Sequence, residues 1–167
     1  MEPPLTLVAF RNRLVSWVRR LILYALKVGE VIGADRAFEI LSELTEEEGE
    51  GWAKKELKRL DIKGIDAISG WELIKNFKQV FGLEALKPEE HVVAEMGPNK
   101  VVVNCTAWCP ILEACVQLKI PCRRVCESLM LSYERGILKI LNPKLKLSVG
   151  KMRPEDKYCE YIIELTE

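Results

Sequence analysis

The second half of the sequence holds all six cysteines, and their spacing is typical of metal ligands. Two pairs have the pattern CxxxC, namely Cys105 with Cys109 and Cys122 with Cys126. Zinc takes four sulfur or nitrogen ligands, commonly as two pairs whose members are two to four residues apart. We therefore predict a zinc site on Cys109, Cys122, Cys126 and Cys159, with Cys105 as the reserve ligand. An iron–sulfur cluster is the alternative cofactor.

Two other roles for these thiols stay open. A free cysteine is also a small buried hydrophobe, and several of these cysteines occupy positions that the local pattern makes apolar. A thiol becomes nucleophilic near a helix N-terminus or beside cations, and Cys122 precedes Arg123 and Arg124 at the start of a predicted helix. Its general base would be His91 or a nearby carboxylate.

Three residues beside the cysteines are candidates for ligand binding. Arg123 and Arg124 place guanidinium groups at a helix N-terminus, where a carboxylate is favoured. Trp108 lies between two cysteines where a strand leaves the predicted sheet, so its ring can line a pocket. The alternative is that both arginines are surface residues and that Trp108 belongs to the core.

The composition excludes several classes of protein. The chain has 167 residues, and its charges cancel, since 25 basic minus 25 acidic residues gives 0. Non-specific nucleic-acid binding needs a broad positive field, so we expect no nucleic-acid partner. The single histidine, His91, excludes metal sites built on several histidines of one chain, and the GxSxG and HExxH motifs do not occur.

The N-terminal segment is apolar but is divided by Arg11, Arg13, Arg19 and Arg20. Its uncharged runs are far shorter than the ~20 residues of a spanning helix, and it lacks the pattern of a signal peptide. We expect no membrane span and a cytoplasmic location, where thiols stay reduced. The wide apolar face of this segment is either core or a homodimer interface.

The apolar spacing predicts helices first and strands later. Phe10, Leu14 and Trp17 recur at helical spacing, whereas HVVAEM and KVVVNC alternate around Gly97-Pro98-Asn99, which is typical of a hairpin. Thr45 and Glu48 have the spacing of a capping box, which predicts a new helix after Leu44. The predicted helices are 5–29, 35–44, 45–60, 66–81 (ended by Gly82), 110–118 and 121–136 (ended by Gly136). The predicted strands are 91–96, 100–105, 145–149 and 159–165, with 137–141 as a further short strand.

These elements predict an α+β fold in one domain of residues 1–167. N-terminal helices pack on a four-stranded antiparallel sheet, and further helices are inserted between its two hairpins. Residues 1–87 form the mainly helical part, and residues 88–167 form the cysteine-rich part of sheet and helix. We expect Trp17, Trp52 and Trp71 in the core.

The second half also resembles a known family. The segments VVVNCTAWCPILEAC, PCRRVCESL, ILNPKLKL and DKYC are similar to those of the L-2-amino-thiazoline-4-carboxylic acid hydrolase-like proteins. The more distant resemblance is to the four-vinyl reductase (hydrocarbon-binding) domain. Cys109-Pro110, Cys126, Asn142-Pro143 and 156–159 carry the resemblance in detail. It implies a ligand cavity between helices and sheet, a cysteine cluster able to hold zinc, and dimerisation through N-terminal helices.

Two functions from different classes follow. The first is a small-molecule-binding domain with a cysteine-ligated zinc site, which holds a small hydrophobic or carboxylate ligand. The second is a hydrolase that opens a cyclic C–N or C–S bond of a thiazoline-type carboxylic acid, with a metal-activated water or a cysteine thiolate. We favour the first, because the sequence supplies metal ligands but no clear acid–base pair.

Overall fold

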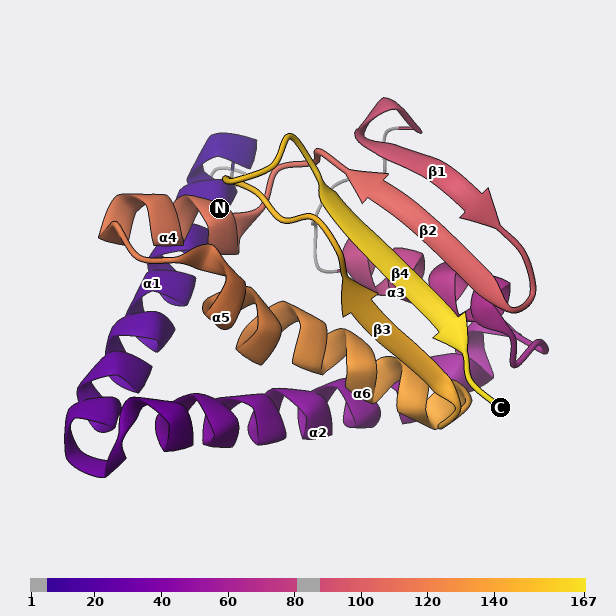
Figure 1. Cartoon of the computed structure of the whole chain (residues 1–167), viewed down its shortest axis with the longest axis horizontal. Helices are drawn as coiled ribbons and strands as arrows, with labels where there is room; N and C mark the ends of the chain where they lie inside the picture. Colours follow the sequence, from indigo (N-terminus) through magenta and orange to yellow (C-terminus); the bar gives the residue numbers. More distant parts are fainter. Residues whose placement is uncertain (1–5, 81–87) are drawn as a thin grey trace, which may run out of the picture.

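The computed structural model describes residues 6–80 and 88–167 and confirms the α+β architecture (Figure 1). The helices are α1 Leu7–Ile32, α2 Ala34–Leu60, α3 Ala67–Val80, α4 Pro110–Leu118, α5 Cys122–Cys126 and α6 Ser132–Leu141, with short turns η1 Pro88–Glu90 and η2 Glu127–Leu131. The strands are β1 His91–Met96, β2 Lys100–Cys105, β3 Leu145–Val149 and β4 Cys159–Leu165. The predicted helix end at Phe81 and Gly82 lies outside the described residues.

The antiparallel sheet has the strand order β1-β2-β4-β3, so both predicted hairpins are confirmed. The two hairpins are joined by pairing between β2 and β4, which places Cys105 directly opposite Cys159. On the other side of β2, Cys105 lies directly opposite His91. Residues directly opposite one another project from the same face of a sheet. One imidazole and two thiols therefore form a row across three strands.

The predicted boundary between two helices at Thr45 is wrong, because α2 runs without a break from Ala34 to Leu60. Thr45 lies inside the helix, and its hydroxyl is 2.9 Å from the carbonyl oxygen of Leu41 and 2.8 Å from that of Ser128. The hydroxyl thus bonds back into its own helix and across to η2, instead of capping a new helix. Tertiary packing along α2 overrides the local capping signal.

The packing of α2 against α6 depends on two glycines. A Cβ on Gly49 would lie 2.1 Å from the carbonyl oxygen of Tyr133, and a Cβ on Gly136 would lie 2.1 Å from that of Glu46. Only glycine allows the two backbones this approach. Gly136 therefore serves a helix crossing and does not end the helix.

The predictions of a helix end at Gly136 and of a short strand at 137–141 are both wrong, because α6 continues to Leu141. Ile137 and Leu138 are completely buried, and burial of one face of α6 holds the segment in the helix. The helix N-terminal to α6 contains one π-helical turn, η2. Such turns occur often at functional sites, and Met130 of η2 lines the cavity described below.

The main core joins the helices to the inner face of the sheet and contains residues from both halves of the chain. Trp71 belongs to it with 2% of its surface exposed, and Trp52 is partly buried in a smaller cluster. The prediction for Trp17 is wrong, since this side chain is 75% exposed. The buried residues of α1 are Val15, Ile22 and Ala25, and Trp17 projects from another side of that helix. Within the described ranges, every helix falls short of the length or hydropathy needed to cross a bilayer.

Candidate functional site

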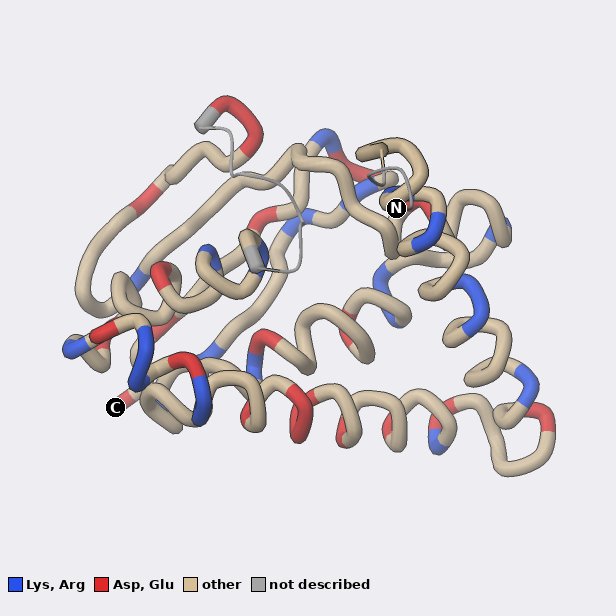
Figure 2. Tube along the Cα trace, turned by 180° about the vertical axis from the view of Figure 1, so that it is seen from behind, with Lys and Arg blue, Asp and Glu red and all other residues tan. Residues whose placement is uncertain are grey.

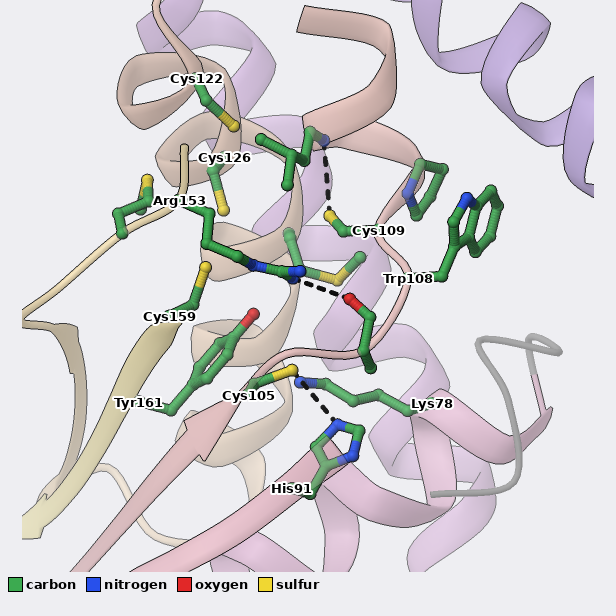
Figure 3. Close-up of a pocket in the computed structure, with 15 residues that line it drawn as sticks. Lys78, His91, Cys105, Trp108, Cys109, Cys122, Cys126, Arg153, Cys159 and Tyr161 are labelled. Atoms are coloured by element: carbon green, nitrogen blue, oxygen red, sulfur yellow. Dashed lines mark hydrogen bonds between the residues drawn. The ribbon is translucent and has the colours of Figure 1, made fainter. Parts of the chain in front are cut away.

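A cavity of about 40 Å³ between the sheet and the helices gathers cysteines from four segments (Figure 3). The lining cysteines come from the end of β2, the start of α4, α5 and the start of β4; they are Cys105, Cys109, Cys122, Cys126 and Cys159. These are the five residues that the sequence marks as candidate metal ligands. The remaining cysteine, Cys115, makes a side-chain hydrogen bond with Cys122, and all six thiols are free. We call this cavity the thiol pocket.

A thiol and an imidazole meet at its floor. The Sγ of Cys105 lies 3.3 Å from Nε2 of His91, within hydrogen-bond reach, and both residues are buried. The contact follows from the register of the first hairpin, which places the two residues opposite one another at the ends of β1 and β2. With its proton on Nδ1, the imidazole can accept the thiol proton at Nε2. The pair therefore has the geometry of a nucleophile and its base.

Lys78 of α3 brings a positive charge to the same floor (Figure 3). Its Nζ lies 3.2 Å from a carboxylate oxygen of Glu134 on α6 and 4.1 Å from the ring centroid of Tyr161. Burial opposes the charged ammonium, but attraction by Glu134 and by Cys105 outweighs it, so the pKa of Lys78 is raised. Burial also raises the pKa of Glu134, although Lys78 counteracts it. This buried ion pair ties α3 and α6 together beneath the pocket.

Arg153 reaches into the thiol pocket from the loop between β3 and β4 (Figure 3). Its guanidinium donates to the carbonyl oxygens of Thr106 at 2.9 Å and Ala107 at 2.7 Å. Its buried Nε has no hydrogen-bond partner within the described residues. Burial is the largest single effect and opposes its charge, but a side-chain hydrogen bond with Cys159 and attraction by Cys159, Cys105 and Cys109 together raise the pKa of Arg153. Among the described residues, no carboxylate lies at ion-pair distance, so the pocket holds one positive charge that faces only thiols and carbonyl groups.

Burial keeps several of the lining thiols protonated. Burial raises the pKa of Cys109 to about 11, although backbone N–H groups of Leu112 and Ile111 favour its thiolate. Burial also raises the pKa of Cys126 well above its usual value. The pKa of Cys105 is raised as well, because burial outweighs the attraction of its thiolate by Lys78. The thiols are therefore weak nucleophiles unless a base takes the proton, and His91 contacts Cys105.

The sulfur atoms are soft donors of the kind that zinc prefers. Within residues 6–80 and 88–167, however, no three His, Cys, Asp or Glu side chains are grouped so that they could hold a metal ion. The guanidinium of Arg153 lies among the sulfur atoms instead (Figure 3). The donor chemistry fits zinc, whereas the side-chain arrangement does not, and the zinc site stays a prediction.

The three residues marked for ligand binding are placed differently from one another. Trp108 lines the thiol pocket, and its indole donates to Glu113 at 2.7 Å. Arg123 donates to the carbonyl oxygen of Gly150 at 3.3 Å, outside the pocket lining.

Arg124 also lies outside the pocket lining and contacts residues of α2. It pairs with Asp35 at 2.6 Å and covers the ring of Phe38. The structure therefore brings Trp108 to the cysteines and leaves both arginines on the surface.

Sequence reasoning missed the two cations of the pocket. Lys78 belongs to an amphipathic helix, and Arg153 belongs to a loop, so neither stands in a motif. The contact between His91 and Cys105 depends on a register shift between Val93 and Glu95, because Met96 pairs with Val101 beside the turn and His91 would otherwise lie opposite Thr106.

A larger apolar cavity of about 190 Å³ adjoins the thiol pocket. Pro110 and Met130 line both cavities. The remaining lining residues of the larger cavity come from α1, α3, α4, η2 and α6: they are Leu14, Val18, Leu21, Phe77, Ile111, Leu129 and Tyr133. One proline and one methionine are thus shared by the walls of the thiol pocket and of the larger apolar cavity.

Comparison with known proteins found no matching family model, no matching curated protein and no matching solved structure. The resemblance to the thiazoline-carboxylic acid hydrolase-like proteins therefore stays a prediction from the quoted segments.

Proposed function

We propose that this protein is a small-molecule-binding domain whose thiol pocket holds a small anionic ligand, most simply a carboxylate. The observation that carries the proposal is Arg153, a guanidinium that faces sulfur atoms and carbonyl groups and has no carboxylate partner in the described part of the chain. Arg153 is partly withdrawn from water, where an anion stabilises a positive charge, and its buried Nε–H can donate to a carboxylate oxygen.

The size of the pocket fits this ligand class. A cavity of about 40 Å³ exceeds the ~10–15 Å³ that a single bound water molecule needs. It accepts a carboxylate group but not a bulky organic molecule. An apolar part of the ligand would extend past Met130 into the larger cavity of about 190 Å³. A ligand with a carboxylate in the thiol pocket and an apolar part in the larger cavity agrees with the small hydrophobic or carboxylate ligand that the sequence predicts.

Calorimetric titration with 2-amino-thiazoline-4-carboxylate, and with its neutral amide as the matched control compound, tests the proposal. The acid should bind the unmodified protein at least about tenfold more tightly than the amide, because a charged hydrogen bond contributes ~1.5–3 kcal/mol. Arg153→Gln should abolish this preference. Arg123→Gln, which removes a guanidinium outside the pocket, should leave it unchanged. Arg153→Lys retains the charge and controls for loss of structure. Equal binding of acid and amide, or an unchanged preference in Arg153→Gln, would overturn the proposal.

A soft metal ion is the second candidate ligand, favoured by the convergence of five thiols from four chain segments on one cavity. Zinc is the first choice and an iron–sulfur cluster the alternative. Metal analysis of protein purified without added metal should then find about one zinc ion per chain. The content should fall in Cys126→Ser, and six freely titrating thiols with no metal would exclude this candidate.

We also propose that two copies associate through α1. Trp17, Tyr24 and Val31 are 75%, 69% and 83% exposed and recur every seven residues along one face. A seven-residue apolar repeat is typical of helices that pair. Arg13, Arg20 and Lys27 follow the same repeat beside it, whereas α2 carries acidic positions along its length (Figure 2). A second copy can therefore place its acidic α2 against the basic flank of α1.

Sedimentation velocity tests the dimer. Unmodified protein should sediment as a dimer, and Trp17→Glu combined with Tyr24→Glu should give a monomer with unchanged circular dichroism. A monomeric unmodified protein would contradict the proposal. A cytoplasmic location stays our proposal on the ground that all six thiols are free.

A further inference from the structure

The thiol pocket holds one pair of side chains that ligand binding alone does not use. Cys105 Sγ lies 3.3 Å from His91 Nε2. The pair is 7% and 8% exposed and lies on the lining of the same cavity as Arg153.

We propose that Cys105 is a nucleophile, activated by His91, that attacks an electrophilic carbon of a small carboxylate held by Arg153. The inference rests on the proposed function for its substrate class and adds a reaction to it. The three groups have separate roles: Cys105 forms the bond, His91 moves the proton, and Arg153 holds the carboxylate.

The step balances without a further cofactor. The proton of the Cys105 thiol passes to Nε2 of His91 as the sulfur adds to the carbon. A C–N or C–S bond of the substrate breaks, and the leaving nitrogen or sulfur takes the proton from His91. Water then adds to the same carbon and gives a proton to His91. The bond from the carbon to Cys105 breaks, and the returning proton restores the thiol.

The other thiols of the pocket are internal controls. Cys126 lines the same cavity and is 6% exposed, close to the 7% of Cys105, but it belongs to α5, away from the row of His91, Cys105 and Cys159. Any difference in reactivity between Cys105 and Cys126 therefore reflects their neighbours and not their accessibility. Cys159 lies directly opposite Cys105, so its rate of alkylation shows whether this position on the sheet is by itself enough to make a thiol reactive.

Two alkylating agents test the nucleophile and the anion site independently of one another. Iodoacetate is a small carboxylate with an electrophilic carbon, and iodoacetamide is its neutral counterpart; both form a carbon–sulfur bond and release iodide. Native protein is treated with each, and the rate at every cysteine is read by mass spectrometry of peptides. We expect Cys105 to react first with both agents, and faster with iodoacetate.

His91→Gln should slow the alkylation of Cys105 at least about tenfold, because a positioned base commonly contributes ~10²-fold or more. It should leave Cys126 unchanged, and the thermal unfolding curve shows whether the variant is folded. His91→Asn is the second variant if the first unfolds. If Cys105 reacts no faster than Cys126, or if both folded variants retain its rate, Cys105 is not the nucleophile. If Cys105 reacts first but shows no preference for iodoacetate, the nucleophile stands and the anion site on Arg153 fails.

Discussion

Substitution of Gly49 tests the close approach of α2 and α6, which positions Glu134 and with it the floor of the thiol pocket. A methyl group on Gly49 would lie 2.1 Å from the carbonyl oxygen of Tyr133, whereas ordinary contacts begin at 3.4 Å. Because the obstructing atom belongs to the backbone, the helices must separate by about 1 Å in a close-packed interior. Overpacking of this kind costs ~1–3 kcal/mol.

Gly51 is the matched control, two residues away in the same helix. A methyl group there meets no atom within 4 Å. Alanine in place of glycine inside a helix stabilises it by up to about 1 kcal/mol. Gly51→Ala should therefore stabilise the protein, while Gly49→Ala should destabilise it by ~1 kcal/mol once the same gain in helix propensity is subtracted from the overpacking cost.

Urea unfolding at equilibrium, followed by circular dichroism, measures both changes. Since 1 kcal/mol shifts the Tm of a domain of this size by about 2–4 °C, the ~2 kcal/mol between the two variants should separate their Tm values by about 4–8 °C. The reasoning is refuted if Gly49→Ala is as stable as Gly51→Ala. It is also refuted if both variants lose stability equally, because the effect then comes from the helix and not from the crossing.

Two further predictions concern the carboxylate of Asp66 and the buried ion pair of Lys78 and Glu134. Asp66 Oδ1 accepts hydrogen bonds from the backbone N–H of Ser69 at 2.9 Å and from its hydroxyl at 2.7 Å, so Asp66→Ala should cost ~1 kcal/mol at neutral pH in a urea titration. Those bonds lower the pKa of Asp66 in the folded protein. The stability that they add is therefore present above the pKa of Asp66 in the unfolded chain and is lost as the pH falls through its pKa in the folded protein. The free energies of unfolding of the variant and of the unmodified protein should then converge in acid. For the buried pair, Glu134→Leu leaves Lys78 without its partner and should cost ~3–5 kcal/mol, whereas Lys78→Met combined with Glu134→Leu should recover most of the loss. A double variant no more stable than the single one would contradict this account of the pair.

The alternation of apolar residues was sufficient to predict the strands and the α+β class. The β1–β2 hairpin follows from its turn, whereas the pairing of His91 with Cys105 also requires the register shift between Val93 and Glu95. The pairing of β2 with β4 joins segments more than fifty residues apart, and no local pattern encodes it. The contact between Cys105 and Cys159 depends on that long-range pairing.

The wrong helix boundaries have one physical cause. Thr45 and Gly136 are local signals for a helix start and a helix end, yet both lie where α2, η2 and α6 pack together. There the hydroxyl binds a carbonyl of a neighbouring segment, and the glycine admits a neighbouring backbone. In both cases tertiary contacts decide the conformation, and these contacts are not readable from residues that are adjacent in sequence.

The cysteines of the candidate site could be predicted from the sequence, whereas its two cations could not. Four of the five thiols could be proposed from the spacing of the two CxxxC pairs, whereas Lys78 and Arg153 come from a helix face and a loop and reach the pocket only through the fold. The two cations change the chemistry from that of a pure thiolate cluster to that of thiols beside positive charge. This positive charge favours an anion over a metal ion as the first ligand.

A crystal structure of the protein with 2-amino-thiazoline-4-carboxylate tests the central claim most directly. The account predicts electron density for the carboxylate in the thiol pocket, against Nε of Arg153. Density for this compound at another place, with Arg153 still surrounded only by thiols and carbonyl groups, would contradict it.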